Sequence, residues 1–254
     1  MKVTLLGTGT SQGVPVIGCN CKVCQSTDKK DNRLRTSAMV ENKDLTLIID
    51  TGPDFRQQML REEVSDIDAV IYTHEHRDHI AGLDDIRPIN FINRKSMQIY
   101  AEDRVLNALK QMLPYAFGEN RYPGVPELNL NKIDLSEFYI GNTKIIPVRV
   151  YHYKLPVMGF RIGDFAYITD ANYIPEEEKE KLFGVKYLVI NALRKKKHIS
   201  HFTLNEALNI VNELSPRKAF ITHLSHQMGL HAEVNKELPK NVQLAYDGLS
   251  FTVK

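Results

Sequence analysis

The sequence predicts an α/β domain in which strands alternate with helices, and two observations lead to this fold class. Short apolar, β-branched runs such as 45–49 and 187–190 recur in both halves of the chain. Amphipathic stretches, of which 102–113 is the clearest, follow several of these runs. Hydrophobic residues make up 43% of the 254 residues and charged residues 25%, a composition typical of a globular protein that buries a sizeable core. We therefore expect one domain over residues 1–254.

The N-terminal segment 1–6 predicts a first strand that leads into a turn at 7–15. This glycine-containing turn is favoured over a phosphate-binding loop because no lysine follows in Walker spacing and no helix pattern opens behind it. The segment also lacks the long apolar core and the cleavage site of a signal peptide, so we expect a cytoplasmic protein. No run approaches the ~20 consecutive apolar residues of a membrane span. We expect no association with a membrane.

The overall charge gives little support for a nucleic-acid partner. The formal net charge is +2 at pH 7, whereas non-specific phosphate binding needs a clustered basic field. The one basic run, Lys195 to Lys197, is interpreted as a solvated surface. We expect no stable nucleic-acid partner, and the oligomeric state stays open, with a homodimer as one alternative.

All three cysteines lie close together near the N-terminus, as Cys19, Cys21 and Cys24. An odd number of cysteines in a reducing compartment argues against a disulfide framework. The C-x-C-x-x-C spacing brings three thiolates together, and a tetrahedral structural zinc site needs one further ligand. The sequence thus favours a metal site, and the alternative is three buried or loosely reactive thiols.

The segment 74–79 carries the densest group of metal-capable side chains in the chain. It follows a buried strand predicted at 68–72, so His74 and His76, two residues apart on the extended exit, point the same way. Asp78 is placed to cap a helix start, with His79 next to it. Imidazoles and a carboxylate in this spacing can supply half of the ligands of a two-metal centre.

The later strands each deliver a polar residue at their end. The expected strands are 144–151, 165–169, 187–190 and 218–222, and the delivered residues are His152, Asp170, Asn191 and His223. Earlier in the chain, the strand 45–49 delivers Asp50 in the same way, before a helix at 54–63. Strand ends of neighbouring strands gather at one rim, which is how a rigid scaffold holds a metal site.

Three further segments complete the expected order of elements. A strand at 97–100 precedes the amphipathic helix 102–113, and the proline- and glycine-rich stretch 114–126 is either a lid over a substrate pocket or a surface connection. The tail 243–251 predicts two short strands about an Asp-Gly turn. A helix begins at Thr203, whose spacing to Glu206 fits a capping box.

The stretch THEHRDHIAGLDDIRPIN at 73–90 resembles the signature of the metallo-β-lactamase superfamily, and in particular its phosphoribosyl cyclic phosphodiesterase subgroup. The resemblance covers nearly the whole chain and implies an αββα sandwich with metals at one edge. It implies that Asp170 bridges two metal ions. It further implies that the first ion is held by His74, His76 and His152 and the second by Asp78, His79 and His223.

The resemblance also assigns residues outside the central motif. It implies that His226 completes the cysteine cluster as the fourth ligand of a structural zinc, and that Asp50 orients a metal ligand without binding metal. It places His201 in the active site, and the alternative is an exposed loop histidine. The neighbourhood of Asn191 and Arg194 departs from the subgroup, which leaves the substrate open.

The activity implied is that of a hydrolase with two divalent ions, zinc or manganese, acting on a small-molecule phosphodiester. A water shared by the two ions would become hydroxide at neutral pH and attack phosphorus. His201 would donate a hydrogen bond or proton at the leaving oxygen, and Asp78 is expected to be both ligand and catalytic residue. The histidine at position 76 fits hydrolytic members of the superfamily, since the di-iron oxygen-reducing members have a carboxylate there. The alternatives are a thioester or amide hydrolase and a non-hydrolytic, metal-bearing biosynthetic accessory protein.

Overall fold

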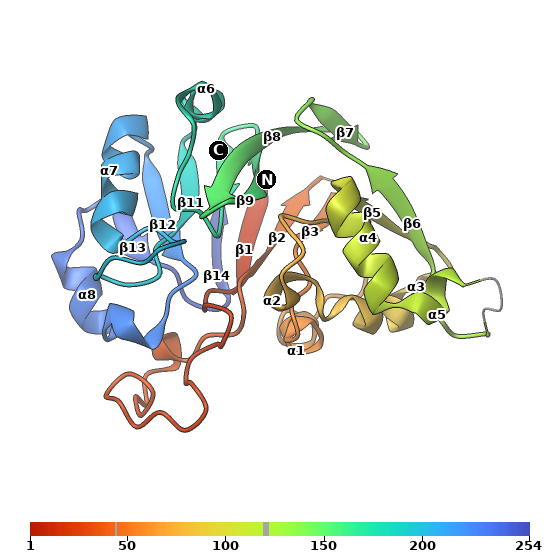
Figure 1. Ribbon diagram of the computed structural model, residues 1–254, viewed down its shortest axis with the longest axis horizontal. Coiled ribbons are helices and arrows are strands. Elements are labelled where there is room, and N and C mark those ends of the chain that lie inside the picture. The colour runs from red at the N-terminus through yellow and green to blue at the C-terminus, as the bar shows by residue number, and fades with distance from the viewer. Residues whose placement is uncertain (44, 119–121) are drawn as a thin grey trace.

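The computed structural model, which describes residues 1–43, 45–118 and 122–254, contains two seven-stranded mixed sheets packed face to face (Figure 1). The strands of the first sheet, in spatial order, are β14 (Leu249–Thr252), β1 (Lys2–Gly7), β2 (Ser37–Asn42), β3 (Leu45–Ile49), β4 (Ala69–Ile71), β5 (Met97–Ala101) and β6 (Leu128–Lys132). Those of the second are β13 (Val242–Leu244), β12 (Lys218–Thr222), β11 (Tyr187–Asn191), β10 (Phe165–Ile168), β9 (Leu155–Ile162), β8 (Thr143–His152) and β7 (Phe138–Ile140).

Each sheet has a parallel half and an antiparallel half. In the first sheet β3, β4, β5 and β6 are parallel neighbours, and in the second sheet β10, β11, β12 and β13 are. Parallel strands end at the same edge of a sheet, so the residues that follow β3 and β4, and those that follow β10 and β12, are brought to a common rim. This topology positions the polar strand ends.

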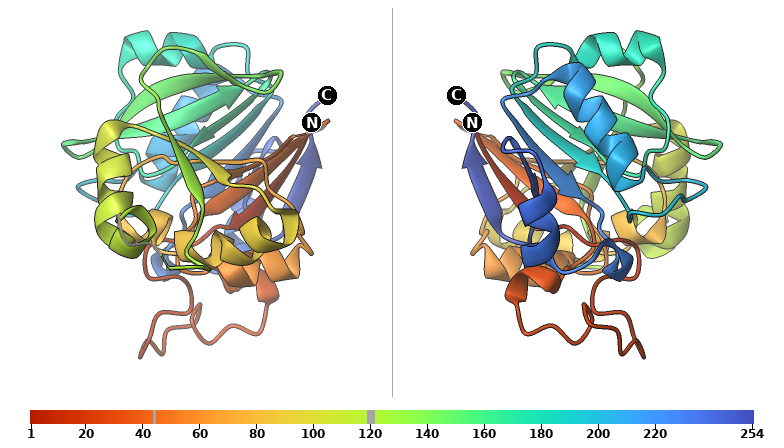
Figure 2. Two further views of the ribbon diagram at one scale, coloured as in Figure 1. Left: turned by 90° about the vertical axis from the view of Figure 1, so that its right-hand side faces the viewer. Right: turned by 90° about the vertical axis from the view of Figure 1, so that its left-hand side faces the viewer.

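Helices cover the outer face of each sheet, as Figure 2 shows edge-on. The first sheet is covered by α1 (Phe55–Arg61), α2 (Arg77–Ile80), α3 (Arg87–Asn93), α4 (Asp103–Met112) and α5 (Pro114–Phe117). The second is covered by α6 (Glu176–Lys179), α7 (Leu204–Leu214) and α8 (His231–Glu237). Short 3₁₀ turns connect them: η1 (Lys29–Asp31), η2 (Leu83–Ile86), η3 (Glu180–Leu182) and η4 (His226–Met228).

Three hydrophobic cores hold these four layers together. The central core joins the inner faces of the two sheets, with Ile49 and Ile71 packed against residues such as Phe160 and Val189. Each of the outer cores joins one sheet to its helices. The predicted α/β fold is therefore confirmed in its αββα form.

Most predicted elements are confirmed within two residues at each end, including the helices at 54–63 and 102–113 and the strands that precede Asp50, His152 and His223. Pattern analysis does not identify β2, β6, β7 and β9. In β9 a proline and a glycine interrupt the apolar pattern, and a Cβ at Gly159 would lie 2.4 Å from the end of the Ile168 side chain, which would have to move to admit it.

The tail differs from the expected hairpin. β13 pairs with β12 in the second sheet, whereas β14 pairs with β1 in the first. The Asp-Gly turn at Asp247 and Gly248 thus carries the chain from one sheet to the other. Both strands add to existing sheet edges, which gives them more neighbours than a two-stranded hairpin would have. The amino group of Met1 lies 3.5 Å from the Val253 carbonyl oxygen, so the two ends lie side by side (Figure 2).

No helix in the described ranges is long and apolar enough to cross a bilayer. The segment between β1 and β2, which contains the three cysteines, extends away from the sheets as an irregular loop (Figure 1). It folds back through η1 before the chain enters β2.

Candidate metal centres

The predicted histidine and aspartate ligands meet at the rim formed by the ends of the strands. β4 leads to His74 and His76, and β8 ends at His152. β10 leads through Thr169 to Asp170, and β12 leads directly to His223. Residues more than a hundred positions apart thus lie at one place because both sheets direct their parallel strand ends to it.

One compact group within this centre comprises Asp78, His79, Asp170 and His223. One ligand atom from each lies within 4.8 Å of the others. His79 Nε2 is 3.2 Å from an oxygen of Asp78 and 3.2 Å from Asp170 Oδ2, and His223 Nδ1 is also 3.2 Å from Asp170 Oδ2. These four are the residues expected around the second ion.

The residues expected around the first ion lie beside this group. The ring centroids of His74 and His76 are 4.6 Å apart, those of His76 and His152 are 5.2 Å apart, and those of His74 and His152 are 6.2 Å apart. The His74 ring also lies 4.2 Å from the His79 ring, so the two sets of residues adjoin. The structure thus brings all seven residues together.

His201 lies inside the centre, and the alternative of an exposed loop histidine is wrong. Only 8% of its surface is exposed, and its Nδ1 is 3.9 Å from Asp170 Oδ1. Its ring centroid is 4.4 Å from that of His152 and 4.8 Å from that of His223. The predicted capping box of α7, formed by Thr203 and Glu206, is present and fixes the chain just after His201.

Unpaired ring nitrogens test whether this centre suits a metal. His74 Nε2, His79 Nε2, His201 Nδ1 and His223 Nδ1 are buried and make no hydrogen bond within the described part of the chain. A buried nitrogen without a partner costs free energy unless something else binds it. Imidazole nitrogens and carboxylate oxygens at this spacing are the donors that zinc and manganese accept, so the residues fit divalent ions.

Asp50 lies behind the predicted ligand His79 and contacts its ring, as expected for a residue that orients a metal ligand without binding metal. It is fully buried, and its Oδ2 lies 2.7 Å from His79 Nδ1. The Thr73 hydroxyl donates to the same oxygen at 2.8 Å and lies 2.9 Å from His74 Nδ1. Both histidines therefore have their Nδ1 engaged by this network, which leaves Nε2 free for a metal.

The charges in the centre favour a bound cation. Burial would raise the pKa of Asp170, but the rings of His223 and His79 outweigh burial and hold this pKa well below its usual range. Burial would likewise lower the pKa of His79, but Asp78, Asp170 and Asp50 together raise it well above its usual value. Burial lowers the pKa of His74 far below its usual value. The lowered pKa values of Asp170 and His74 correspond to the ionised carboxylate and the neutral imidazole that metal binding requires, whereas the raised pKa of His79 reflects the negative charge around it, and a bound ion would replace its Nε2 proton.

Three site residues adopt a left-handed backbone conformation that non-glycine residues rarely use. The φ angles are 63° at Asp50, 52° at Asp170 and 56° at His223. Such residues cluster at functional sites because the surrounding structure must hold the unfavourable conformation. No residue pattern in the sequence indicates this turn of the chain at the strand ends.

The structure changes the roles predicted for Asp78 and Asn191. Asp78 lies in the first turn of α2 and does not cap it, because the N-cap position is His76; the carboxylate instead faces His79. Asn191, delivered by β11, bonds the backbone N–H and carbonyl of Ala171 at 2.9 Å each, so it fixes the chain after Asp170. That role was not foreseen from the sequence.

The stretch 114–126, predicted as a lid or a surface connection, begins with a short helix that contacts the 3₁₀ turn η2. Pro114–Phe117 form α5, and the Tyr115 hydroxyl donates to Asp84 in η2. Residues 119–121 lie outside the described residues, so the prediction of a lid over 114–126 stays a prediction.

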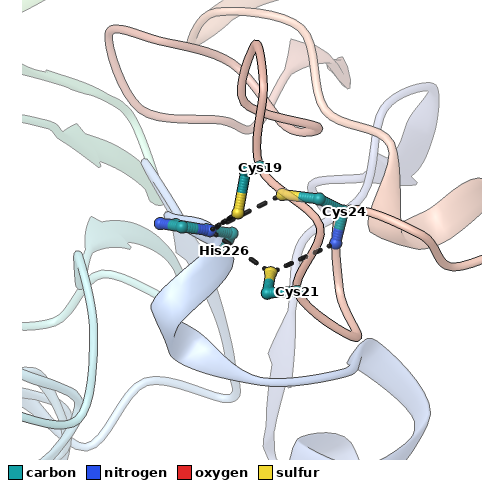
Figure 3. Close-up of side chains that lie close together, drawn as sticks. All are labelled: Cys19, Cys21, Cys24 and His226. Carbon is teal, nitrogen blue, oxygen red and sulfur yellow. Dashed lines mark hydrogen bonds between the residues drawn. The ribbon is translucent and has the colours of Figure 1, made fainter.

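The second candidate centre is the cysteine cluster, shown in Figure 3. The Sγ atoms of Cys19, Cys21 and Cys24 lie 3.2, 3.3 and 3.5 Å from His226 Nδ1. The cysteines come from the loop between β1 and β2, and the histidine begins η4, more than two hundred residues later. Two ligands of a tetrahedral zinc ion lie about 3.5 Å apart, so these four residues have the spacing of a structural zinc site.

The cysteine thiols differ in their readiness to ionise. The backbone N–H of Cys24 lowers the pKa of Cys21 to about 6, against the opposing effect of burial. Burial raises the pKa of Cys24 to about 11. A metal ion would require all three as thiolates, and its charge would supply the stabilisation that Cys24 lacks.

Comparison with known proteins identifies the family. The model of the β-lactamase superfamily domain matches residues 46–224, which contain every residue of the histidine and aspartate centre. The chain belongs to the metallo-β-lactamase superfamily. A solved structure described as a new diphosphatase from the PhnP family superimposes with a TM-score of 0.93 at 39% identity, covering 100% of this chain and 98% of that one.

Two curated relatives of this superfamily member have other names. An octanoyltransferase of Porphyromonas gingivalis is 40% identical over 252 residues, which are 98% of this chain and 51% of the relative. A coenzyme PQQ synthesis protein B of Methylorubrum extorquens is 33% identical over 97 residues, 33% of this chain and 32% of the relative. The chain thus spans about half or less of the length of these relatives.

Proposed function

We propose that this protein is a dinuclear metal-dependent hydrolase that cleaves a phosphodiester or diphosphate bond in a small molecule. The observation that carries the proposal is a group of metal-capable side chains, Asp78, His79, Asp170 and His223, whose ligand atoms lie within 4.8 Å of one another and whose ring nitrogens are buried and unpaired among the described residues. The similarity over the full chain to a diphosphatase of the PhnP family supports attack at phosphorus.

His74, His76 and His152 would hold one ion, Asp78, His79 and His223 the other, and Asp170 would contact both. Two divalent ions, zinc or manganese, would supply an activated water and neutralise charge on the phosphoryl oxygens. The chain's own residues set the geometry, because Asp50 engages His79 directly and Thr73 links it to His74.

His201 would serve the leaving group. It is buried, its ring lies 4.4 Å from that of His152 and 4.8 Å from that of His223, and its Nδ1 has no hydrogen-bond partner among the described residues. Burial, then the charge of His223, lowers the pKa of His201 to about 2, so a neutral ring at this position would donate a hydrogen bond to the oxygen that leaves phosphorus. Cleavage of a phosphodiester and cleavage of a diphosphate both need a donor at the leaving oxygen, so His201 would have the same role in either reaction.

A second candidate function is the hydrolysis of a thioester by the same centre. The observation that favours it is the alignment of 98% of this chain with part of a protein named octanoyltransferase. The tetrahedral intermediate of acyl transfer also carries an oxyanion that a metal centre could stabilise. A non-hydrolytic role in cofactor biosynthesis is the third alternative, and the similarity that suggests it covers a third of the chain.

A substrate panel separates these candidates. The metal-loaded protein would be tested on aryl phosphodiesters, ribose and nucleotide cyclic phosphates, nucleoside diphosphates and an octanoyl thioester, with Asp170→Asn as the inactive control. We expect turnover of at least one phosphodiester or diphosphate that the variant does not support. Turnover of the thioester alone would falsify the phosphodiesterase proposal, and no turnover of any compound would favour the biosynthetic role.

A further inference from the structure

Two arginines join the two sheets beside the histidine and aspartate centre. Arg104 lies in the first turn of α4, which covers the first sheet, and Arg149 lies in β8 of the second sheet. Glu102, the N-cap residue of α4, lies between them. Arg149 donates to the two carboxylate oxygens of Glu102 at 3.0 and 2.5 Å, and Arg104 Nε lies 3.4 Å from Glu102 Oε2. The proposed mechanism uses neither arginine.

Arg104 contacts the central motif through Glu75. Its Nη1 donates to the Glu75 carboxylate. Glu75 lies between His74 and His76 on the extended segment that follows β4, where side chains alternate in direction, so it points away from the two histidines and toward α4. The arginine therefore holds the backbone between two residues that are proposed as ligands of the first ion.

Arg104 also contacts the hairpin that carries His152, the third residue proposed for the first ion. Its Nη2 donates to the carbonyl of Pro156 in β9. Pro156 pairs with Tyr151 in β8, one position before His152. A guanidinium presents its donors in a rigid planar fork, so it holds two acceptors in a fixed relation to each other. One side chain thus connects the central motif to the β8–β9 hairpin.

His76 is the proposed ligand of the first ion that depends most on this connection. The Thr73 hydroxyl lies 2.9 Å from His74 Nδ1, and the Ser200 carbonyl oxygen lies 2.8 Å from His152 Nδ1. By contrast, His76 is exposed, and its ring has no hydrogen-bond partner among the described residues. The position of the His76 ring is therefore set by the backbone on either side of it.

The charges of the network cancel, which limits how it can act on the metal centre. Two arginines alternate with two glutamates in the order Glu75, Arg104, Glu102, Arg149. Burial would raise the pKa of Glu102, but the hydrogen bonds and charges of the two arginines lower it, so the carboxylate is ionised. Because the network carries no net charge, it affects a bound ion through the position of the ligands.

We propose that Arg104 is a positioning residue that sets the affinity of the first metal ion. By holding the central motif on one side and the β8–β9 hairpin on the other, it fixes His76 relative to His152. The residues proposed for the second ion make no hydrogen bond or ion pair with Arg104 in the described part of the chain, so that ion should keep its affinity without the arginine. The inference rests on the proposed function for the presence of two ions.

Titration of the chelator-treated protein with Mn²⁺ tests this role without requiring turnover. Electron paramagnetic resonance measures the free ion, and the wild-type protein should bind two Mn²⁺ ions per chain at the histidine and aspartate centre. In Arg104→Gln one binding step should weaken about 10- to 100-fold, the loss typical of a residue behind a metal ligand, and the other should change less than about threefold. His152→Ala identifies the step of the first ion, because it removes a ligand of that ion alone.

Glu75→Gln separates positioning from a general effect on the fold. The amide keeps an acceptor oxygen but loses the charge, so the same step should weaken about threefold to tenfold. The double variant should bind the first ion no more weakly than Arg104→Gln, because both changes break one interaction. Lys132→Gln is the matched control and should leave both steps unchanged, because it removes the ion pair of an exposed lysine with Asp103 of the same helix. Excess Mn²⁺ should restore turnover to Arg104→Gln, which a folding defect would not allow.

Three results would overturn the inference: two unchanged steps in Arg104→Gln, equal weakening of both steps, or an equal loss in Lys132→Gln. If Arg104→Gln does not fold, the partly exposed Glu75→Gln decides in its place, and an unchanged first step in that variant would overturn the inference. Two bound Mn²⁺ ions without turnover of any phosphodiester or diphosphate would count against the proposed function and leave this inference standing. Binding of a single ion by the wild-type protein would overturn both.

Discussion

The two candidate metal centres are built in opposite ways. The histidine and aspartate centre lies at the ends of strands from both sheets; most of its residues are buried, His76 is exposed, and the Asp50 carboxylate behind His79 holds that ring in place. The cysteine cluster is partly exposed and joins an irregular loop to η4. Rigid strands hold side chains to the accuracy that catalysis demands, whereas a loop gains most of its order from a bound metal. We therefore expect chemistry from the first centre and stability from the second.

Asp170 gives the largest expected effect. Its Oδ2 faces His79 and His223, and its Oδ1 lies 3.9 Å from His201, so Asp170→Asn removes the negative charge at the middle of the centre. We expect turnover to fall at least about a thousandfold, with a circular-dichroism spectrum and Tm close to those of the wild type. If Asp170→Asn unfolds the protein and leaves kcat per folded molecule intact, the two centres have been assigned the wrong way round.

Cys21→Ser should show the reverse pattern. A lost thiolate weakens the metal that joins the N-terminal loop to η4, so we expect Tm to fall by about 10 °C. kcat for a small substrate such as methyl p-nitrophenyl phosphate should change less than about threefold, because the strand-end centre is untouched. A thermal melt and a kcat measurement on the same preparation decide this. Loss of kcat with an unchanged Tm would contradict the assignment of chemistry to the strand-end centre and of stability to the cysteine cluster.

Asp50→Asn sharpens the comparison within the buried centre. The amide retains the size of the carboxylate but no longer holds the Nδ1–H of His79 as an anion, so metal affinity and kcat should fall about 10- to 100-fold. Both oxygens of Asp50 accept hydrogen bonds, Oδ1 from the Thr73 backbone N–H and Oδ2 from the Thr73 hydroxyl, so the NH₂ of an asparagine would face a donor and Tm should fall as well. Metal titration followed by thermal melts measures both effects. A large drop in Tm with unchanged metal affinity would show that Asp50 serves packing alone.

His231 gives the smallest effect and concerns the surroundings of the cysteine loop. The Arg33 guanidinium donates to its Nδ1 at 3.2 Å, and its backbone N–H donates to Asp31, which also accepts from Ser26 of the loop. Burial, then the charges of Arg33 and Lys30, lower its pKa to about 4 against the opposing effect of Asp31.

The sign of the pH effect follows from that lowered pKa. Between pH 6.5 and about 4 the unfolded chain binds a proton that folded His231 does not, so stability falls as the pH falls through this window. We expect His231→Gln, which still accepts from Arg33, to show a shallower decline of Tm over this range. A variant with the same decline as the wild type would rule out His231 as its source.

The sequence predicts the two centres unequally, for physical reasons. Spacing within a short segment identifies the group from His74 to His79 and the three cysteines, because ligands close in sequence need no knowledge of the fold. The partners Asp170 and His223 follow recognisable buried strands, so the position of each at a strand end is predictable. His226 and His201 lie outside strands, and the resemblance to known hydrolases was needed to assign them.

Other features could not be predicted from residue patterns. The left-handed backbone at Asp50 and Asp170 occurs at residues other than glycine, so no residue type marks it in the sequence. The separation of β13 from β14 depends on sheet edges that local patterns do not describe.

Metal content measured before and after chelation tests the central claim most directly. Elemental analysis of the purified protein should find up to three ions per chain. A chelator should remove two of them together with all turnover, and the third should stay bound unless Cys21 or Cys24 is replaced. A single ion per chain at full occupancy, or removal of the cysteine-bound ion as the step that abolishes turnover of a small substrate, would contradict the account.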